Sequence, residues 1–257
     1  MKEKSKGKYV PRERDENGFW KIDKKTRLDI PAPDFSNVDY LSEEDKALGA
    51  KLVAARMPQA DWGLGDSPKR ENIWWQQPSF LLLCDPKSAE FFFEWFNSVV
   101  TAVTGLDGLS ELYPVCLKKD GINSREKSND PDVRRKLSNA LLMGLAIGVE
   151  FDDQYCHRLY SLLPLDQREF IEGSDYVMDS EKIAMLRFPR SSVWSEEESL
   201  ALQFTYAVMR RKMTDEIWDH AMASWGEKET IRNIHWIGLY THLYMFQNAM
   251  DLRLGEW

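Results

Sequence analysis

The stretch SEEESLALQFTYAVMRRK, residues 195–212, decides the fold class, because it has the features of an amphipathic helix with a defined start. Ser195 and Glu198 have the S-x-x-E spacing of a capping box, in which each side chain accepts a hydrogen bond from the other residue's backbone N–H. Its apolar residues recur at helical spacing and predict one buried face, made of Leu200, Phe204, Ala207 and Val208.

The sequence that follows continues the helical pattern. TDEIWDHAMASWG predicts a helix that starts at Thr214 and stops near Gly226, since glycine is common just past a helix end. Residues 228–254 predict a long final helix. One stripe of that helix has small and polar members, as at a close helix contact or an oligomer interface: Ile231, Ile234, Gly238, Thr241, Met245, Asn248 and Leu252.

The preceding sequence also predicts helices. Ser42 is suited to cap a helix over 42–57, and Pro86 predicts a break between two helical pieces. The stretch PDVRRKLSNALLMGLAIGVE, 131–150, opens with proline, and its Gly144 and Gly148 would let another backbone approach closely. No stretch alternates convincingly as a strand, so we predict an all-α fold.

The predicted domain organisation has two parts. Residues 1–40 contain Pro11, Pro31 and Pro33 with little periodicity, and we expect an extended N-terminal arm. Residues 41–257 form a single helical domain with a polar loop insertion near 105–132.

Composition narrows the class of protein. The 257 residues are 43% hydrophobic and carry a net charge of −8, which does not suit a nucleic-acid binder. No stretch resembles a signal peptide or a membrane span. The three cysteines, Cys84, Cys116 and Cys156, are too scattered for a disulfide framework. We expect a cytoplasmic protein with reduced thiols that binds neither nucleic acid nor membrane.

The stretch GVEFDDQYCHRLYSLL, 148–163, gathers the polar groups that suit catalysis. If one helix ends near Glu150 and the next begins at Asp152 or Asp153, then Asp153 and His157 share a helix face. A histidine oriented by a carboxylate can act as a general base. The alternative is a histidine that only satisfies a capping carboxylate, and Cys156 points to an adjacent face.

Other catalytic motifs are absent from the sequence. There is no phosphate-binding glycine loop, no GxSxG and no HExxH. His235 and His242 could share a helix face, but they lack a carboxylate at ligand spacing, so we predict no metal and no cofactor. Trp74 and Trp75 would form either an aromatic lid over a substrate or ordinary core and rim packing.

Three stretches together resemble the carboxymuconolactone decarboxylase and alkylhydroperoxidase D-like family. They are residues 56–103, 131–161 and 195–250, so the resemblance covers about 56–252 without the 105–130 loop. It implies an all-α alkylhydroperoxidase D-like helical bundle. It also implies a homo-oligomer, either a dimer, a trimer or a hexamer.

The resemblance places the family's histidine on His157 and its last-helix tyrosine turn on Tyr240. The CxxC of the peroxidase branch is missing, because only Cys156 is present and position 153 is aspartate. The family's glutamate falls near Lys136 or Ser138, so that acid is also missing. Glu150, Asp152 or Asp153 could replace it.

These residues lead to three hypotheses. The first is a cofactor-independent lyase or isomerase that acts on a small organic acid, lactone or polyketide-like metabolite. The second is a thiol-dependent redox protein that uses Cys156. The third is a non-catalytic binding or scaffold relative. The predicted catalytic residues are Glu150, Asp152, Asp153, Cys156, His157 and Tyr240, and the predicted substrate-binding residues are Trp74, Trp75, Tyr155, His235 and His242.

Overall fold

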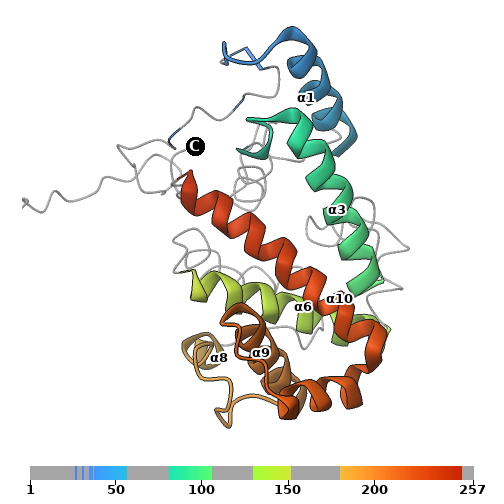
Figure 1. Ribbon diagram of the computed structural model, residues 1–257, viewed down its shortest axis with the longest axis vertical. Helices are drawn as coiled ribbons and strands as arrows, with labels where there is room; N and C mark the ends of the chain where they lie inside the picture. Colours follow the sequence, from blue (N-terminus) through green and yellow to red (C-terminus); the bar gives the residue numbers. More distant parts are fainter. Residues whose placement is uncertain are drawn as a thin grey trace, which may run out of the picture.

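Every regular element that the structure describes is an α-helix (Figure 1). The computed structural model describes residues 27, 31, 35–36, 38–56, 81–105, 130–151 and 180–250. The all-α expectation is therefore confirmed for this part of the chain. The helices are α1 (Glu43–Arg56), α3 (Pro86–Thr104), α6 (Pro131–Glu150), α8 (Ser180–Ala184), α9 (Glu196–Met209) and α10 (Asp215–Ala249).

Helix α10 runs across the molecule and packs against α3, α6 and α9 (Figure 1). Helix α9 also packs on α6, and α1 packs on α3. The apolar core lies between these helices. It includes Leu142, Met143 and Ile147 of α6, Leu200 and Phe204 of α9, and Val100 of α3, and none of these is more than 2% exposed.

The starts of the helices follow the capping chemistry predicted from the sequence. Ser195 Oγ accepts a hydrogen bond from the Glu198 N–H, and Glu198 accepts one from the Ser195 N–H, so the capping box of α9 is confirmed. Thr214 caps α10 and Ser42 accepts from the Asp45 N–H at the start of α1. Asp85, which the sequence analysis did not predict as a cap, caps α3, and the first residue of α3 is a proline.

Helix α10 is interrupted at Gly226 rather than stopped there. Gly226 has φ 72° and ψ 170°, which are non-helical values open to glycine, and the helix resumes directly afterwards. The Thr230 hydroxyl lies 2.8 Å from the Gly226 carbonyl oxygen and 3.4 Å from the Ala221 carbonyl oxygen, so this side chain links the helical turns on the two sides of the kink. The predicted boundary is therefore correct in position, and the chain uses it to change direction.

Helix α10 lies in register beside α6. The Trp236 indole N–H donates to the Ala140 carbonyl oxygen at 2.8 Å, and the Asn248 side chain donates to the Phe151 carbonyl oxygen at 3.2 Å. Between these two points, a Cβ added to Gly144 would come within 3.3 Å of the Tyr240 ring. The two helices thus run in the same direction, and Gly144 permits the close approach that its sequence position predicted.

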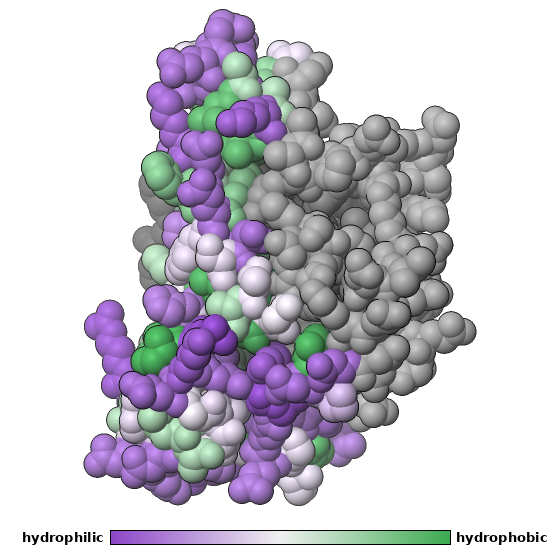
Figure 2. All heavy atoms as spheres, turned by 90° about the vertical axis from the view of Figure 1, so that its right-hand side faces the viewer, coloured by the Kyte–Doolittle hydropathy of each residue, from purple (hydrophilic) through white to green (hydrophobic). Residues whose placement is uncertain are grey.

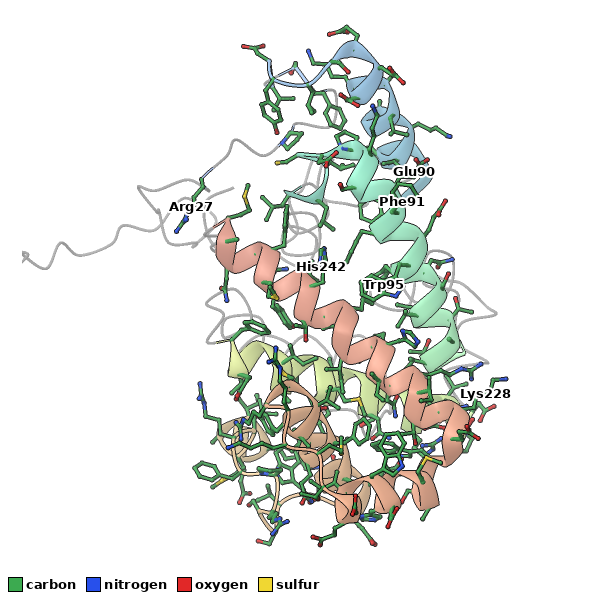
Figure 3. All side chains as sticks on the ribbon, viewed as in Figure 1. Arg27, Glu90, Phe91, Trp95, Lys228 and His242 are labelled. Carbon is green, nitrogen blue, oxygen red and sulfur yellow. The ribbon has the colours of Figure 1, made fainter. Side chains whose placement is uncertain are left out.

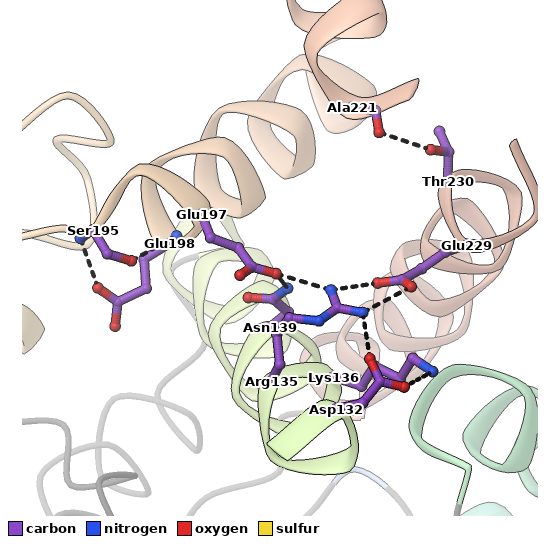
Figure 4. Close-up of polar contacts among 10 residues, drawn as sticks. All are labelled: Asp132, Arg135, Lys136, Asn139, Ser195, Glu197, Glu198, Ala221, Glu229 and Thr230. Carbon is purple, nitrogen blue, oxygen red and sulfur yellow. Dashed lines mark hydrogen bonds and ion pairs between the residues drawn. The ribbon is translucent and has the colours of Figure 1, made fainter. Parts of the chain in front are cut away.

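One arginine joins three helices (Figure 4). Arg135 of α6 donates to Glu229 of α10 at 2.8 and 3.0 Å and to Glu197 of α9 at 2.9 Å. Asn139, which is 4% exposed, adds a hydrogen bond to Glu197 at 2.8 Å. The hydrogen bonds to Glu229 raise the pKa of Arg135, although partial burial opposes this.

A short part of the predicted N-terminal arm is described. Phe35 and Val38 are each 1% exposed, and a Cβ on Gly49 of α1 would overlap the Phe35 ring. The Arg27 N–H donates to the Met250 carbonyl oxygen at 3.0 Å, just past the end of α10. The predicted insertion lies mostly outside the described residues, and the structure places its last two positions, 131 and 132, in α6.

Replacing Arg135 by alanine should lower the free energy of unfolding by about 1–3 kcal/mol, because Glu197 and Glu229 would lose their shared donor in a partly buried site. Chemical denaturation measures this. Lys136→Ala is the matched control, since it removes a neighbouring exposed pair with Asp132 and should cost about 0.5 kcal/mol or less. Equal losses in the two variants would contradict a linking role for Arg135.

Candidate functional site

Four of the predicted site residues lie in the described part of the chain. Glu150 ends α6, and His235, Tyr240 and His242 belong to α10. The other predicted residues lie outside the described residues: Trp74, Trp75, Asp152, Asp153, Tyr155, Cys156 and His157. The described residues nearest to His157 in sequence are those at the end of α6.

Tyr240 lies on the side of α10 that faces α6. Its ring is 4.7 Å from the Trp236 ring and 5.8 Å from the Tyr244 ring, measured between centroids. Tyr244 is 4% exposed and follows Tyr240 by one turn. We call Trp236, Tyr240, Tyr244 and Gln247, together with the facing side of α6, the α6–α10 seam.

Gln247 extends this seam by another turn and has one of the four buried side-chain atoms that lack a hydrogen bond in the described part of the chain. The residue is 1% exposed, and within the described part of the chain its Oε1 accepts no hydrogen bond. An unpaired buried amide oxygen is costly, so such atoms are few in native proteins. Sequence analysis did not predict Tyr244 or Gln247, although their spacing of four and seven residues from Tyr240 places them on one helix face.

Glu150 lies on a different side of α6, towards α9. Arg210 donates to both of its carboxylate oxygens, at 2.7 Å from Nε and 2.6 Å from Nη2. This pairing lowers the pKa of Glu150, although partial desolvation opposes the effect. Glu150 is therefore held as a carboxylate and is poorly suited to donate a proton.

The surroundings of that ion pair are structural. The Arg210 guanidinium lies 4.4 Å from the centre of the Tyr206 ring, and the Tyr206 hydroxyl donates to the Leu186 carbonyl oxygen at 2.7 Å. Burial raises the pKa of Tyr206 to about 12, so this hydroxyl stays protonated. Arg187 donates to the Val149 carbonyl oxygen near the end of α6. These contacts hold the last turn of α6 in place.

The two histidines of α10 that the sequence analysis singled out, His235 and His242, lie away from Tyr240. Both are exposed, and His242 stacks on Phe92 of α3 with 5.2 Å between ring centroids. Figure 3 places His242 and Trp95 towards each other between α10 and α3. The structure therefore does not bring His242 and Tyr240 together, because residues two apart on a helix point in nearly opposite directions.

The described residues contain no group of three His, Cys, Asp or Glu side chains that could hold a metal ion. Cys84 is the cysteine in this part of the chain, and burial raises the pKa of its thiol. A thiol with a raised pKa is a weak nucleophile at neutral pH.

The comparisons with known proteins add no relative. No family model, no curated protein and no solved structure matches this chain. Among the described helices, none is both long and apolar enough to cross a membrane.

The ion pair of Glu150 should make stability depend on pH in a defined direction. Because the folded-state pKa is lowered, the pair stabilises the fold above the ordinary glutamate pKa of 4.5, and this contribution is lost as the pH falls through the lower folded value. Glu150→Gln should cost about 1 kcal/mol at neutral pH, a difference that shrinks at more acidic pH. Denaturation at a series of pH values measures it.

Arg210→Gln provides the check, because it removes the partner and leaves the carboxylate. It should abolish the same part of the pH dependence. If wild type and both variants lose stability in parallel below pH 4.5, the ion pair is not the cause.

Proposed function

We propose that this chain is a cofactor-independent lyase or isomerase on an alkylhydroperoxidase D-like helical bundle. Its substrate would be a small organic acid, lactone or polyketide-like metabolite. One observation carries the proposal. In the α6–α10 seam, Tyr240, Tyr244 and Gln247 lie along one side of α10, and the Gln247 Oε1 has no hydrogen-bond partner among the described residues. The facing helix, α6, is followed in sequence by Asp152, Asp153 and His157.

The proposed chemistry is proton transfer without a metal or nucleotide. His157 removes a proton next to a carbonyl or carboxylate group, and Asp153 orients the imidazole. Tyr240 delivers a proton to the other end of the reacting unit. The lowered pKa of Glu150 favours Tyr240 over Glu150 in this role, and Asp152 remains the alternative acid.

Gln247 adds a role for substrate binding. An amide oxygen accepts hydrogen bonds, so Oε1 would pair with a substrate group that carries a proton, such as a hydroxyl, an enol or an undissociated acid. In a buried site this hydrogen bond gains strength, because little water competes for it. The unpaired oxygen then has a physical reason to persist.

Two other classes of function remain as alternatives. A redox protein would need Cys156 as a low-pKa thiolate, together with a second, resolving thiol. Cys84 is a poor substitute for the Cys156 thiolate, because its own pKa is raised. A scaffold relative would show no His157-dependent turnover. The expected cytoplasmic location and homo-oligomeric state belong to the same proposal.

Loss of His157 should abolish turnover while the fold is kept. We would incubate wild type and His157→Ala in heavy water with unsaturated acids, lactones and metabolite extracts, and read the products by mass spectrometry. Loss of carbon dioxide, loss of water or deuterium uptake should appear with wild type alone. Tyr240→Phe should then lower kcat by roughly 10²–10⁴-fold, the range for a positioned acid.

Tyr206→Phe is the matched control for Tyr240→Phe. Among the described residues, the hydroxyl that it removes bonds to the Leu186 carbonyl oxygen alone, so the change should lower stability by about 1 kcal/mol and leave kcat unchanged. Identical product spectra from wild type and His157→Ala across the panel would reject proton transfer at His157.

Replacing Gln247 by leucine separates substrate binding from folding. The variant removes a buried acceptor that has no partner within the described residues, so it should unfold at the same or higher denaturant concentration than wild type. Its KM for the active substrate should rise by about tenfold, the loss expected for one hydrogen bond. A variant with lower stability and an unchanged KM would show that Gln247 serves the fold alone.

A further inference from the structure

Basic side chains gather around the end of α9. The loop between α8 and α9 contributes two arginines and a phenylalanine, and the end of α9 contributes three cations. All six side chains are exposed. We call this region the α9 basic surface and define it by Arg187, Phe188, Arg190, Arg210, Arg211 and Lys212. Its five cations and the neighbouring carboxylate of Glu150 give a net charge of +4, in a chain whose net charge is −8.

The two segments of this surface lie side by side. Arg190 Nε donates to the Gln203 side-chain oxygen of α9 at 3.0 Å. Arg210 lowers the pKa of Glu150 by its hydrogen bonds and Arg187 adds a smaller effect of its charge, so both guanidinium groups lie near that carboxylate. Gln203 and Arg210 are two turns apart, about 10 Å along the α9 axis. The cations therefore follow one side of the helix to its end.

The loop holds its exposed phenylalanine in a fixed position. Phe188 is 61% exposed, and its carbonyl oxygen accepts hydrogen bonds from the Trp194 indole N–H at 3.1 Å and the Ser191 N–H at 3.0 Å. The Ser199 hydroxyl of α9 donates to the Pro189 carbonyl oxygen at 2.6 Å. An apolar contact on a loop that is already ordered costs little further entropy when a partner binds.

Arg211 stands where a helix end favours glycine. The Lys212 N–H donates to the Ala207 carbonyl oxygen at 2.8 Å and the Arg211 N–H to the Val208 carbonyl oxygen at 3.2 Å, which is the pattern of a Schellman motif. Arg211 has φ 56°, a left-handed value that glycine adopts without a Cβ penalty. A strained backbone that carries an exposed guanidinium indicates a use for this side chain beyond ending the helix.

Three of the cations are available to a partner. Within the described ranges, none of Arg190, Arg211 and Lys212 forms an ion pair. The negative end of the α9 dipole stabilises cations at this position. Asp215 and Glu216 follow in the first turn of α10 and limit the basic surface on that side.

Apolar area alone does not single out a docking surface elsewhere on the described chain. Figure 2 views the side of the molecule on which α3 lies, where the described residues show hydrophobic side chains interspersed with hydrophilic ones. At the α9 basic surface, by contrast, charge of one sign is concentrated in a chain of the opposite net sign. Such a local field attracts a partner of complementary charge.

We propose that the α9 basic surface binds a short acidic segment of a partner protein. Carboxylates of the segment pair with Arg190, Arg211 and Lys212, and an apolar side chain of the segment packs on Phe188. In an extended segment, alternate side chains point the same way at intervals of about 7 Å. Acidic residues two to four positions apart therefore span the row of cations.

The small size of the surface favours a short segment over a larger polyanion. Apart from this +4 region, the chain has a net charge of −12. A nucleic acid or an anionic membrane would extend past the cations and meet that negative remainder, and the repulsion acts over about 8 Å at physiological ionic strength. A short acidic segment contacts the basic residues alone.

This proposal goes beyond the proposed enzyme activity and does not rest on it. The surface adjoins Glu150 on the side of α6 that faces α9, whereas Tyr240 and Gln247 lie in the α6–α10 seam. The experiments below measure binding and no turnover, so failure of either proposal does not decide the other.

The first experiment titrates the full chain into a fluorescent peptide of about eight residues, with glutamate at most positions and one central leucine. Fluorescence anisotropy should show binding that weakens as salt is raised. Replacing the leucine by serine should raise the dissociation constant by about tenfold, because the contact with Phe188 is lost. With Phe188→Ser, the two peptides should bind alike.

Charge reversal locates the site. Arg190→Glu and Lys212→Glu should each raise the dissociation constant by about tenfold, because each places a carboxylate against the acidic peptide. Lys228→Glu is the matched control and should change it by about twofold or less. Lys228 is exposed and precedes Glu229, which Arg135 joins to the start of α9, so it lies far from the basic end of that helix. Circular dichroism confirms that each variant is folded.

Arg211→Gly separates binding from stability. Glycine relieves the left-handed backbone, so the variant should unfold at the same or a higher denaturant concentration than wild type. It should nevertheless raise the dissociation constant of the peptide about threefold, as expected for the loss of one exposed ion pair. A residue that only ended the helix would leave peptide binding unchanged.

Four outcomes would overturn the proposal. One is the absence of peptide binding at physiological ionic strength. Another is binding that Arg190→Glu and Lys212→Glu weaken no more than Lys228→Glu does. The third is an Arg211→Gly variant that binds the peptide like wild type. The last is a single-stranded oligonucleotide or a phosphatidylserine vesicle that binds the same surface at least as tightly as the peptide.

Discussion

The packing of α10 on α6 is the constraint on which the rest of the described structure depends. The Trp236 indole N–H reaches the Ala140 carbonyl oxygen inside the core, and Gly144 leaves room for the Tyr240 ring. Together they set both the register and the separation of the two helices. Because α10 also packs on α3 and α9, its position on α6 determines where those helices lie.

The two sides of α6 carry different chemistry. Towards α9 and the start of α10, charged groups pair at half-buried positions, as in Arg135 with Glu229 and Glu150 with Arg210. Water still screens these pairs, so their role is to fix the helices in place. Towards the later part of α10, the named seam side chains are neutral, and Tyr244 and Gln247 are buried, where an unpaired oxygen is costly. Proton transfer fits the second environment better than the first.

The two sides of α10 divide in a similar way. Its inner side presents Tyr240 and Gln247 to α6, whereas its outer side presents Gly238 and Met245 to solvent. His242 belongs to the outer side, where it bridges to the aromatic residues of α3. We predicted His242 as a substrate-binding residue, and this stays a prediction; the structure shows its ring contacts with Phe92 and Trp95.

The sequence by itself determined the helical class, the caps of α1, α9 and α10 and the break at Pro86, whereas α8 and the capping roles of Asp85 and Asp130 came only from the structure. Ser195 with Glu198, Thr214, Pro86 and Gly226 act through hydrogen bonds and backbone angles within a few residues, so local spacing reveals them. The same spacing placed Tyr240 on a helix. The pairing of Glu150 with Arg210, in contrast, could not be predicted, because the two residues are far apart in the chain. Only the tertiary structure decided which face of each helix is buried. It left Trp95 of α3 partly exposed and, among the described residues, the Gln247 oxygen of α10 without a hydrogen bond. Burial depends on what packs opposite a residue, and helical periodicity records the side on which it lies without recording its neighbour.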